Sequence, residues 1–312
     1  MTVSRALNHP ERVSPVTLAK VMEAVRTTGF VPNAMAVGLR SSRAKLVAAL
    51  LPTLVGPVFQ ETVKSLSATL ELHGYQLMIG ETGYGRSNED ALLDAVIRRR
   101  PDGIVLTGVM HSSAGRNRLA ASGIPVVETW DLTASPIDML VGFSHEEIGA
   151  QVRRYLHDHR HVKVALISAD DDRARRRAEG FRKAGALLGL RGEVPMVFMP
   201  APSTLGAGRA GLRRLLRDHA VTAVFCSSDT LALGAMIEAQ AMNLRVPQDL
   251  AIVGFGDQEF AKDLEPPLTT VRVDGTQIGK IAAELVVERV EKRPSGRTIV
   301  DIGFSVVQRS SG

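Results

Sequence analysis

The amino-acid sequence predicts an α/β protein in which a small all-α head precedes two subdomains, each built on a parallel sheet. From Leu46 onward, short runs that are apolar throughout alternate with amphipathic segments of helical period. This pattern is typical of strands that are buried on both faces and joined by helices. About nine such runs are too many for one comfortable sheet in this length, which favours two similar subdomains.

Length and composition limit the class of protein. The chain has 312 residues, of which 45% are hydrophobic, enough for two or three folded units with sizeable cores. No apolar run approaches the roughly 20 residues that cross a bilayer, and the N-terminus lacks the pattern of a signal peptide. Cys226 is the only cysteine, which excludes an intrachain disulfide. We therefore expect a cytoplasmic protein with no membrane partner.

The formal charge of +5 is concentrated at one end of the chain. Residues 1–45 hold seven basic and two acidic side chains, whereas the rest of the chain is neutral overall. A solvated basic tail would explain the charge alone. Because the segment is also helically patterned, we favour a head that binds the phosphates of nucleic acid.

Two helices are predicted in this head. The longer one spans residues 14–28, where Ser14 can cap its start and Gly29 can end it. Its apolar stripe is Leu18, Val21, Met22 and Val25. In the shorter one, Met1–Asn8, a polar face could meet DNA, with an arginine fork on guanine. An ordinary amphipathic helix explains these few residues about as well.

A marginal helix is predicted between head and core, over Pro32–Arg40. Asn33 can cap it and Ala36 can propagate it, but Gly38 weakens it. An exposed Leu39 on such a helix suits a hinge that orders on DNA and wedges the leucine into a minor-groove step. A plain linker is the alternative.

Eight apolar runs are predicted as strands of the core. They are Leu46–Leu51, Tyr75–Ile79, Gly103–Leu106, Pro125–Glu128, Val162–Ile167, Val194–Met199, Ala223–Cys226 and Leu250–Phe255. The segment Asp131–Phe143 breaks the alternation and is predicted to cross between the subdomains. Pro266-Pro267 marks a second break, after which a last helix, Gln277–Arg293, and a final strand pair are expected.

An ordered series of motifs resembles the LacI/GalR family of bacterial repressors, the lactose-repressor type. Thr2–Asn8, Arg12-Val13-Ser14 and Pro32–Arg40 resemble its recognition helix, turn and hinge. The core continues the pattern with Arg177 and Gly180-Phe181, Ser228-Asp229 and Leu233-Gly234, Val246-Pro247 and Asp249, Val253-Gly254-Phe255, and Pro267-Leu268-Thr269-Thr270-Val271. The series spans essentially the whole chain. The residue pattern of the chain, including Val253–Asp257, is similar to that of the gluconate-operon repressors of this family.

The resemblance implies a helix-turn-helix head, a hinge and two Rossmann-like subdomains of the periplasmic-binding-protein type. The expected boundaries are 1–30 for the head, 31–45 for the hinge, 46–142 plus about 272–297 for the N-terminal subdomain, and 143–271 plus about 298–312 for the C-terminal subdomain. It also implies a homodimer on pseudo-palindromic operator DNA. The residues expected to contact DNA are Thr2, Ser4, Arg5, Asn8, Asn33, Ala36, Leu39 and Arg40.

A sugar or sugar-acid effector, gluconate among the candidates, is expected between the subdomains. Its expected contacts are Phe59, Trp130, Arg177, Ser228, Asp229 and Asp257. Arg177 can bind a carboxylate bidentately, although it also belongs to a basic helical run. Asp229 follows a strand at a ligand-binding edge, although it could equally be a helix N-cap.

The other expected contacts carry less specific signals. Phe59 and Trp130 could face the carbon skeleton of the effector. Ser228 stands where the family more often has asparagine, and the family's acidic ligand usually precedes Asp257, at the position of Gly256. These departures indicate a different effector.

Two other functions were weighed. A sugar-binding sensor without DNA activity, headless or periplasmic in type, is the alternative, but the basic head and the missing signal peptide argue against it. An enzyme is less favoured, because no nucleophile motif is present and His157, His159 and His161 lack partners at zinc spacing. We expect no catalysis, cofactor or metal.

The start of the chain departs from the family pattern. There, an additional helix and turn of about 15–20 residues brace the recognition helix from its N-terminal side. Without them, Thr2–Asn8 is shorter than helices that persist alone in water. We therefore expect a frayed head with poor operator affinity and a start codon placed too far downstream. A genuine headless regulator is the alternative.

Overall fold

The computed structural model describes residues 2–30, 44–54, 57–83, 86–110, 112–190, 192–293, 296 and 298–312. The chain divides into two compact units, Met1–Ala44 and Lys45–Gly312, which correspond to the head and the core. The expected hinge residues Asn33, Ala36, Leu39 and Arg40 lie outside the described residues.

The head contains α1 (Thr2–Asn8), a 3-10 turn η1 (Pro10–Arg12) and α2 (Pro15–Thr28). The predicted caps of α2 are confirmed, because Ser14 Oγ accepts a hydrogen bond from the backbone N–H of Thr17 and Gly29 adopts a left-handed φ of 63°. No residue of α2 is buried, and the predicted stripe is only half-covered, with Met22 48% exposed.

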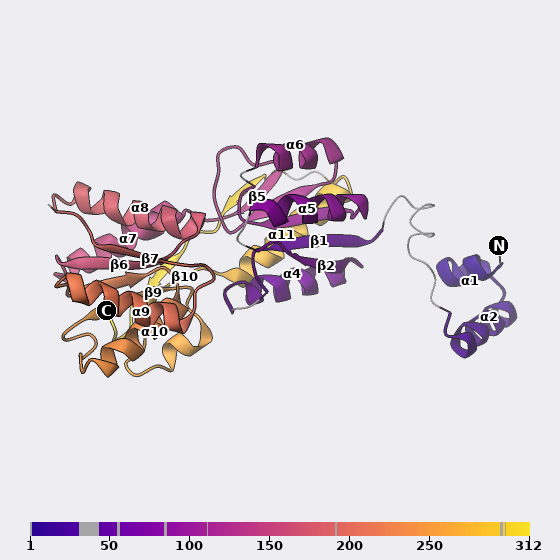
Figure 1. Ribbon diagram of the computed structural model, residues 1–312. Helices are drawn as coiled ribbons and strands as arrows, with labels where there is room; N and C mark the ends of the chain where they lie inside the picture. The colour runs from indigo at the N-terminus through magenta and orange to yellow at the C-terminus, as the bar shows by residue number, and fades with distance from the viewer. Residues whose placement is uncertain are drawn as a thin grey trace. The chain divides into compact units, whose positions relative to one another are not determined.

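The first subdomain of the core is a six-stranded sheet with helices on both faces (Figure 1). Its order is β11 (Ile299–Asp301), β5 (Met139–Gly142), β4 (Val126–Thr129), β3 (Gly103–Thr107), β1 (Leu46–Leu51) and β2 (Gln76–Glu81), with all pairs parallel. Alternate residues of β1 point to opposite faces. Val47 and Ala49 join the core under α4 (Gln60–Leu72) and α11 (Gly275–Val290). Ala48 and Leu50 join the core under α5 (Arg86–Arg98) and α6 (Ser113–Ser122).

The second subdomain has the same layered plan. Its order is β12 (Ser305–Val307), β10 (Thr269–Arg272), β9 (Ala251–Phe255), β8 (Ala223–Cys226), β6 (Val164–Ala169) and β7 (Met196–Met199), with β12 antiparallel to β10. One face packs against α7 (His145–Asp158) and α8 (Asp172–Leu187). The other packs against α9 (Leu205–Asp218) and α10 (Asp229–Ala241).

Two glycines let α7 and α8 approach backbone to backbone. A Cβ at Gly149 of α7 would lie 1.9 Å from the carbonyl oxygen of Arg177, and one at Gly180 of α8 would lie 1.9 Å from that of Glu146. Only glycine fits at either position. The close contact holds the helix that begins with His145 against the helix that carries Arg177.

Two expectations about the chain path were wrong. The predicted crossover Asp131–Phe143 contains a buried strand, β5, which is short and follows a turn-rich stretch. The expected final strand pair does not exist as a pair, because β11 joins β5 in the first sheet and β12 joins β10 in the second. The chain therefore changes subdomain between residues 301 and 305, rather than near 298.

Two further 3-10 turns, η2 (Pro57–Phe59) and η3 (Glu259–Lys262), lie in loops.

Candidate functional site

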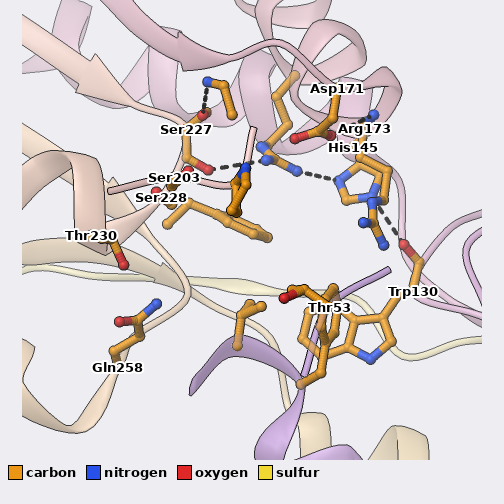
Figure 2. A pocket seen from close by; sticks show the side chains of 16 residues that line it. Thr53, Trp130, His145, Asp171, Arg173, Ser203, Ser227, Ser228, Thr230 and Gln258 are labelled. Atoms are coloured by element: carbon orange, nitrogen blue, oxygen red, sulfur yellow. Dashed lines mark hydrogen bonds between the residues drawn. The ribbon is translucent and has the colours of Figure 1, made fainter. Parts of the chain in front are cut away.

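A cavity lies where strands of both sheets end, the edge at which ligands of open α/β sheets bind. It contains about 100 Å³, less than the roughly 300–1,000 Å³ of typical ligand pockets. Its lining includes Thr53, Phe59, Trp130, His145, Asp171, Arg173, Arg177, Ser203, Ser227, Ser228, Thr230, Phe255 and Gln258 (Figure 2). The first subdomain supplies mainly rings, and the second supplies charges and hydroxyls.

Two aromatic side chains form the apolar wall. Phe59 and Trp130 pack edge to face, with ring centroids 5.1 Å apart, and both are buried. The Trp130 indole Nε1 donates a hydrogen bond of 3.1 Å to Thr62 Oγ1, which fixes the orientation of the ring. Trp130 also has a φ of 63°, a left-handed conformation that bulky residues adopt mainly at functional sites. Both residues therefore line the cavity, and their contact with an effector stays a prediction.

His145 joins the two subdomains and was missed by the sequence analysis. Ser144 caps α7 and places His145 in its first turn. A dashed line in Figure 2 joins its Nε2 to the Trp130 carbonyl oxygen, 3.0 Å away. Its Nδ1 lies 2.9 Å from Arg177 Nη1. A carbonyl only accepts and a guanidinium only donates, so Nε2 carries the proton. Burial, and then the charges of Arg177 and Arg173, hold the pKa of His145 well below its usual range.

Arg177 lines the cavity from α8, but protein groups occupy much of its guanidinium. Besides Nη1, which donates to His145, Nη2 donates to the Ser227 carbonyl oxygen at 3.0 Å, and Cζ lies 4.1 Å from the centre of the Phe255 ring. Nε is buried and has no hydrogen-bond partner among the described residues. Burial lowers the pKa of Arg177 to about 10, so the side chain remains charged near neutral pH.

Arg173, one turn earlier on α8, also reaches the cavity. Asp171 caps this helix by accepting hydrogen bonds from the backbone N–H groups of Arg173 and Ala174. The Arg173 guanidinium lies over the Phe59 ring, with Cζ 5.3 Å from its centre, and Nη1 is buried without a hydrogen-bond partner in the described part of the chain. Buried donors normally have partners, and a carboxylate is the strongest acceptor for a guanidinium.

The structure corrects the expected position of Asp229. This side chain does not line the cavity; it is fully buried, and its carboxylate accepts hydrogen bonds from Thr270 Oγ1 at 2.5 Å and from the backbone N–H of Gln258 at 2.8 Å. Burial raises the pKa of Asp229 to about 6. Asp229 therefore positions the loop that brings Gln258 to the cavity, while the neighbouring Ser228 caps α10 and lines the cavity.

Asp257 is also absent from the cavity lining. Its carboxylate accepts a hydrogen bond of 2.7 Å from Arg309 Nη2, and Arg272 lies 4.0 Å away. Asp257 has a φ of 46° because it lies in the sharp turn after β9. Its carboxylate therefore binds arginines of the same subdomain, so the expected contact with an effector is not supported by its position.

An ion pair beside the cavity joins the subdomains. Arg176 on α8 donates to Asp131, which follows β4; one of the two hydrogen bonds, from Nη1 to Oδ1, is 2.7 Å long. Asp131 is buried, and burial raises its pKa although Arg176 opposes that shift. This pair holds the second subdomain to the first next to two lining residues, Trp130 and Arg177.

Only part of the predicted DNA-binding set can be placed. Thr2 and Arg5 are exposed on α1, whereas the side chains of Ser4 and Asn8 lie outside the described residues. Among the described residues, no group of three side chains is arranged to hold a metal ion, and no helix is long and apolar enough to cross a membrane.

Several lining residues were missed because the sequence shows the end of a strand but not the direction of each side chain. His145, Arg173 and Gln258 all follow strands closely. A search for polar residues within a few positions of each predicted strand end would have found Gln258, but not His145, because the strand that precedes His145 was not predicted.

Two family models match the chain. The model described as bacterial regulatory proteins, lacI family, matches residues 1–33, and the model described as a periplasmic binding protein-like domain matches residues 153–312. The second match alone covers about half of the chain. Together they cover the head and the subdomain that contributes the charged side of the cavity.

Full-length relatives match as well. The chain is 31% identical to the HTH-type transcriptional regulator GntR of Escherichia coli K12 over 309 residues, covering 98% of this chain and 92% of the relative. It is 32% identical to GntR of Pseudomonas aeruginosa, covering 100% and 91%. A crystal structure of a LacI-family transcriptional regulator from Silicibacter pomeroyi superimposes with a TM-score of 0.93 at 30% identity, covering 100% and 95%.

Proposed function

This chain belongs to the lacI family of bacterial regulatory proteins, and from that premise we propose that a sugar acid, with gluconate as the first candidate, controls its affinity for operator DNA. The protein is a ligand-responsive, DNA-binding repressor. Its head reads the operator, and its core binds the effector. We propose a cytoplasmic homodimer, because two heads related by a two-fold axis match the two half-sites of a pseudo-palindromic operator.

The two unpaired guanidinium nitrogens carry the proposal for an acidic effector. Arg173 Nη1 and Arg177 Nε are buried donors without partners among the described residues, on neighbouring turns of one helix. An effector carboxylate would pair with both. The hydroxyls of Ser203, Ser227 and Thr230 suit a polyhydroxy chain, and the opposing rings suit its carbon skeleton.

The small volume of the cavity supplies a route from effector binding to DNA binding. At about 100 Å³ it must widen to admit a sugar acid. Widening moves Arg173 away from Phe59 or separates Arg176 from Asp131, and both contacts cross between the subdomains. Effector binding and the narrow arrangement therefore compete. This competition is the differential affinity that lets a ligand shift a conformational equilibrium.

Titration calorimetry with gluconate tests the effector proposal. We expect saturable binding to the wild-type protein and a loss of at least tenfold in Arg173→Gln, the magnitude of one charge-assisted hydrogen bond. Arg175→Gln is the matched control, because Arg175 lies on the same helix but pairs with Asp170 and packs on Phe198, outside the cavity. Equal affinities for the two variants would refute the role of Arg173.

The link to DNA needs a second measurement. An operator selected from random duplexes is titrated at fixed salt, with and without gluconate. We expect gluconate to change operator affinity at least fivefold in the wild type and not in Arg173→Gln. Gluconate binding that leaves operator affinity unchanged would contradict the proposed regulation.

A further inference from the structure

A second cavity lies at the opposite edge of the second sheet, near the starts of β6, β7 and β8. It contains about 670 Å³, within the roughly 300–1,000 Å³ of typical ligand pockets. Arg153 of α7 and Gly185 of α8 line its inner part, and Lys163, Glu193 and His219 come from loops at its rim. The first cavity and its lining residues lie at the other end of the same sheet.

Arg153 is the unusual residue of this cavity. It is 2% exposed and is among the largest fully buried side chains of the protein. Its Nε and Nη1 atoms are buried and have no hydrogen-bond partner within the described residues, and its described ring contact is the Phe181 ring, 5.5 Å away. An arginine keeps its charge inside a protein. A buried charge without a partner is strongly unfavourable, so such groups are normally paired or solvated by an ion or water.

The backbone beside Arg153 leaves room for its guanidinium. A Cβ at Gly185 would lie 3.1 Å from Arg153 Nε and 3.7 Å from its Nη2. The glycine thus lets the planar group lie against α8 at the cavity wall. At the rim, Lys163 is exposed and adds a second positive charge, whereas Arg182 and Asp218 are already paired with Glu179 and Arg217.

We propose that this cavity binds a small organic anion, bearing a carboxylate or a phosphate, through Arg153 and Lys163. A guanidinium binds either group with short, charge-assisted hydrogen bonds, and the ammonium at the rim adds a point charge. Glu193 is the one rim carboxylate that has no described basic partner. Glu193 is therefore the protein's own carboxylate that would compete with the bound anion for Arg153. The site is independent of the proposed effector, because it shares no lining residue with the first cavity.

The test uses the full chain with inorganic phosphate and succinate as probes, at constant ionic strength. We expect at least one probe to bind saturably by calorimetry and to raise Tm progressively as its concentration increases. Arg173→Gln should still bind the probe, and this result would show that the probe does not bind in the effector cavity. Lys163→Glu should weaken it at least fivefold. Lys262→Glu is the matched control, an identical change at an exposed lysine of η3.

Arg153→Met completes the test, because it removes the buried charge while keeping an unbranched side chain. We expect this variant to fold, to be at least as stable as the wild type without anion, and to bind neither probe. Should it not fold, the comparison of Lys163→Glu with Lys262→Glu decides.

Three results would overturn the proposal. Neither probe binds the wild type; the two lysine variants lose affinity equally; or binding disappears in Arg173→Gln. A further variant, Glu193→Gln, identifies an internal counterion. If it lowers Tm and only then permits probe binding, Glu193 rather than a ligand neutralises Arg153.

Discussion

The two subdomains share a plan but contribute opposite chemistry to the cavity between them. In each, the five successive strands are arranged in the same spatial order, and only the last strand differs, parallel as β11 and antiparallel as β12. The first subdomain presents Phe59 and Trp130, whereas the second presents two arginines and several hydroxyls. A common backbone thus fixes where the site lies, and the residues that follow each strand fix what it binds.

This division predicts that substitutions in the second subdomain change affinity most, because they remove charge-assisted contacts, and that those in the first change it less. Contacts between the subdomains should alter the equilibrium between narrow and wide cavities instead of the contacts to the effector. The following predictions would break or refine that division.

Arg177→Ala should have the largest effect. We expect gluconate affinity to fall by more than tenfold, and the free energy of unfolding to fall by about 1–3 kcal/mol because His145 Nδ1 and the Ser227 carbonyl lose their donor. Calorimetry and urea unfolding measure the two effects. Arg182→Ala, on the exposed face of the same helix, is the control. Unchanged gluconate affinity would remove Arg177 from the site.

Phe59→Ala tests the apolar wall. We expect gluconate to bind about fivefold more weakly, since the loss of one partly shared apolar contact corresponds to about 1 kcal/mol. Leu54→Ala, at an exposed position of the same subdomain, should leave the affinity unchanged. A loss as large as that of Arg177→Ala would mean that the two subdomains do not divide the binding as argued.

Asp131→Asn weakens the ion pair with Arg176 between the subdomains. Because that pair stabilises the narrow cavity, we expect gluconate to bind about threefold more tightly, as the cost of widening decreases. Stopped-flow fluorescence of Trp130 should show faster association. Weaker binding would instead show that the pair belongs to the bound form.

The pH dependence of stability tests the buried His145 contact, whose expected effect is on folding and not on gluconate affinity. The pKa of His145 is lowered on folding, so the unfolded chain takes up a proton below pH 6.5 that the folded chain does not. The stabilisation that neutral His145 contributes is therefore fully present above pH 6.5 and is lost as the pH falls below that value. Asp229, whose pKa is raised to about 6, contributes the opposite slope in the wild type and in His145→Gln, so the comparison is made between them. Between pH 7 and 5 we expect the free energy of unfolding of the wild type to fall by about 1–2 kcal/mol relative to that of His145→Gln. His219→Gln, at an exposed histidine, should keep the wild-type slope.

Sequence patterns predicted the strands better than the paths between them. The eight apolar runs all contain strands, because burial on both faces leaves a continuous local signal. Strands β5 and β10 escaped, although β4 and β8 are equally short, because the turn-rich stretch before each of them breaks the alternation of apolar runs and helical segments. The partners of β11 and β12 could not be read locally, since both are short and pair with strands more than 30 residues away in sequence.

The candidate site shows the same limit at the scale of side chains. Arg177 and Asp229 were both expected to contact the effector, yet one lines the cavity and the other is turned into the core. That difference depends on Thr270 and the Gln258 backbone, which lie far along the chain and form the hydrogen bonds that hold Asp229. No local pattern reports such partners. Likewise, the unpaired nitrogen of Arg173 is visible only once its neighbours are placed.

The close contact at the two glycines joins α7 and α8 into one rigid pair of helices in the second subdomain. With Gly149 and Gly180 against facing carbonyls, neither helix can slide or tilt without steric overlap, so the pair moves as one body. His145 and Arg177, which line the first cavity, lie toward one end of this helix pair. Arg153 and Gly185, which line the second cavity, lie about two turns further along their helices. A displacement imposed at either end must reach the other.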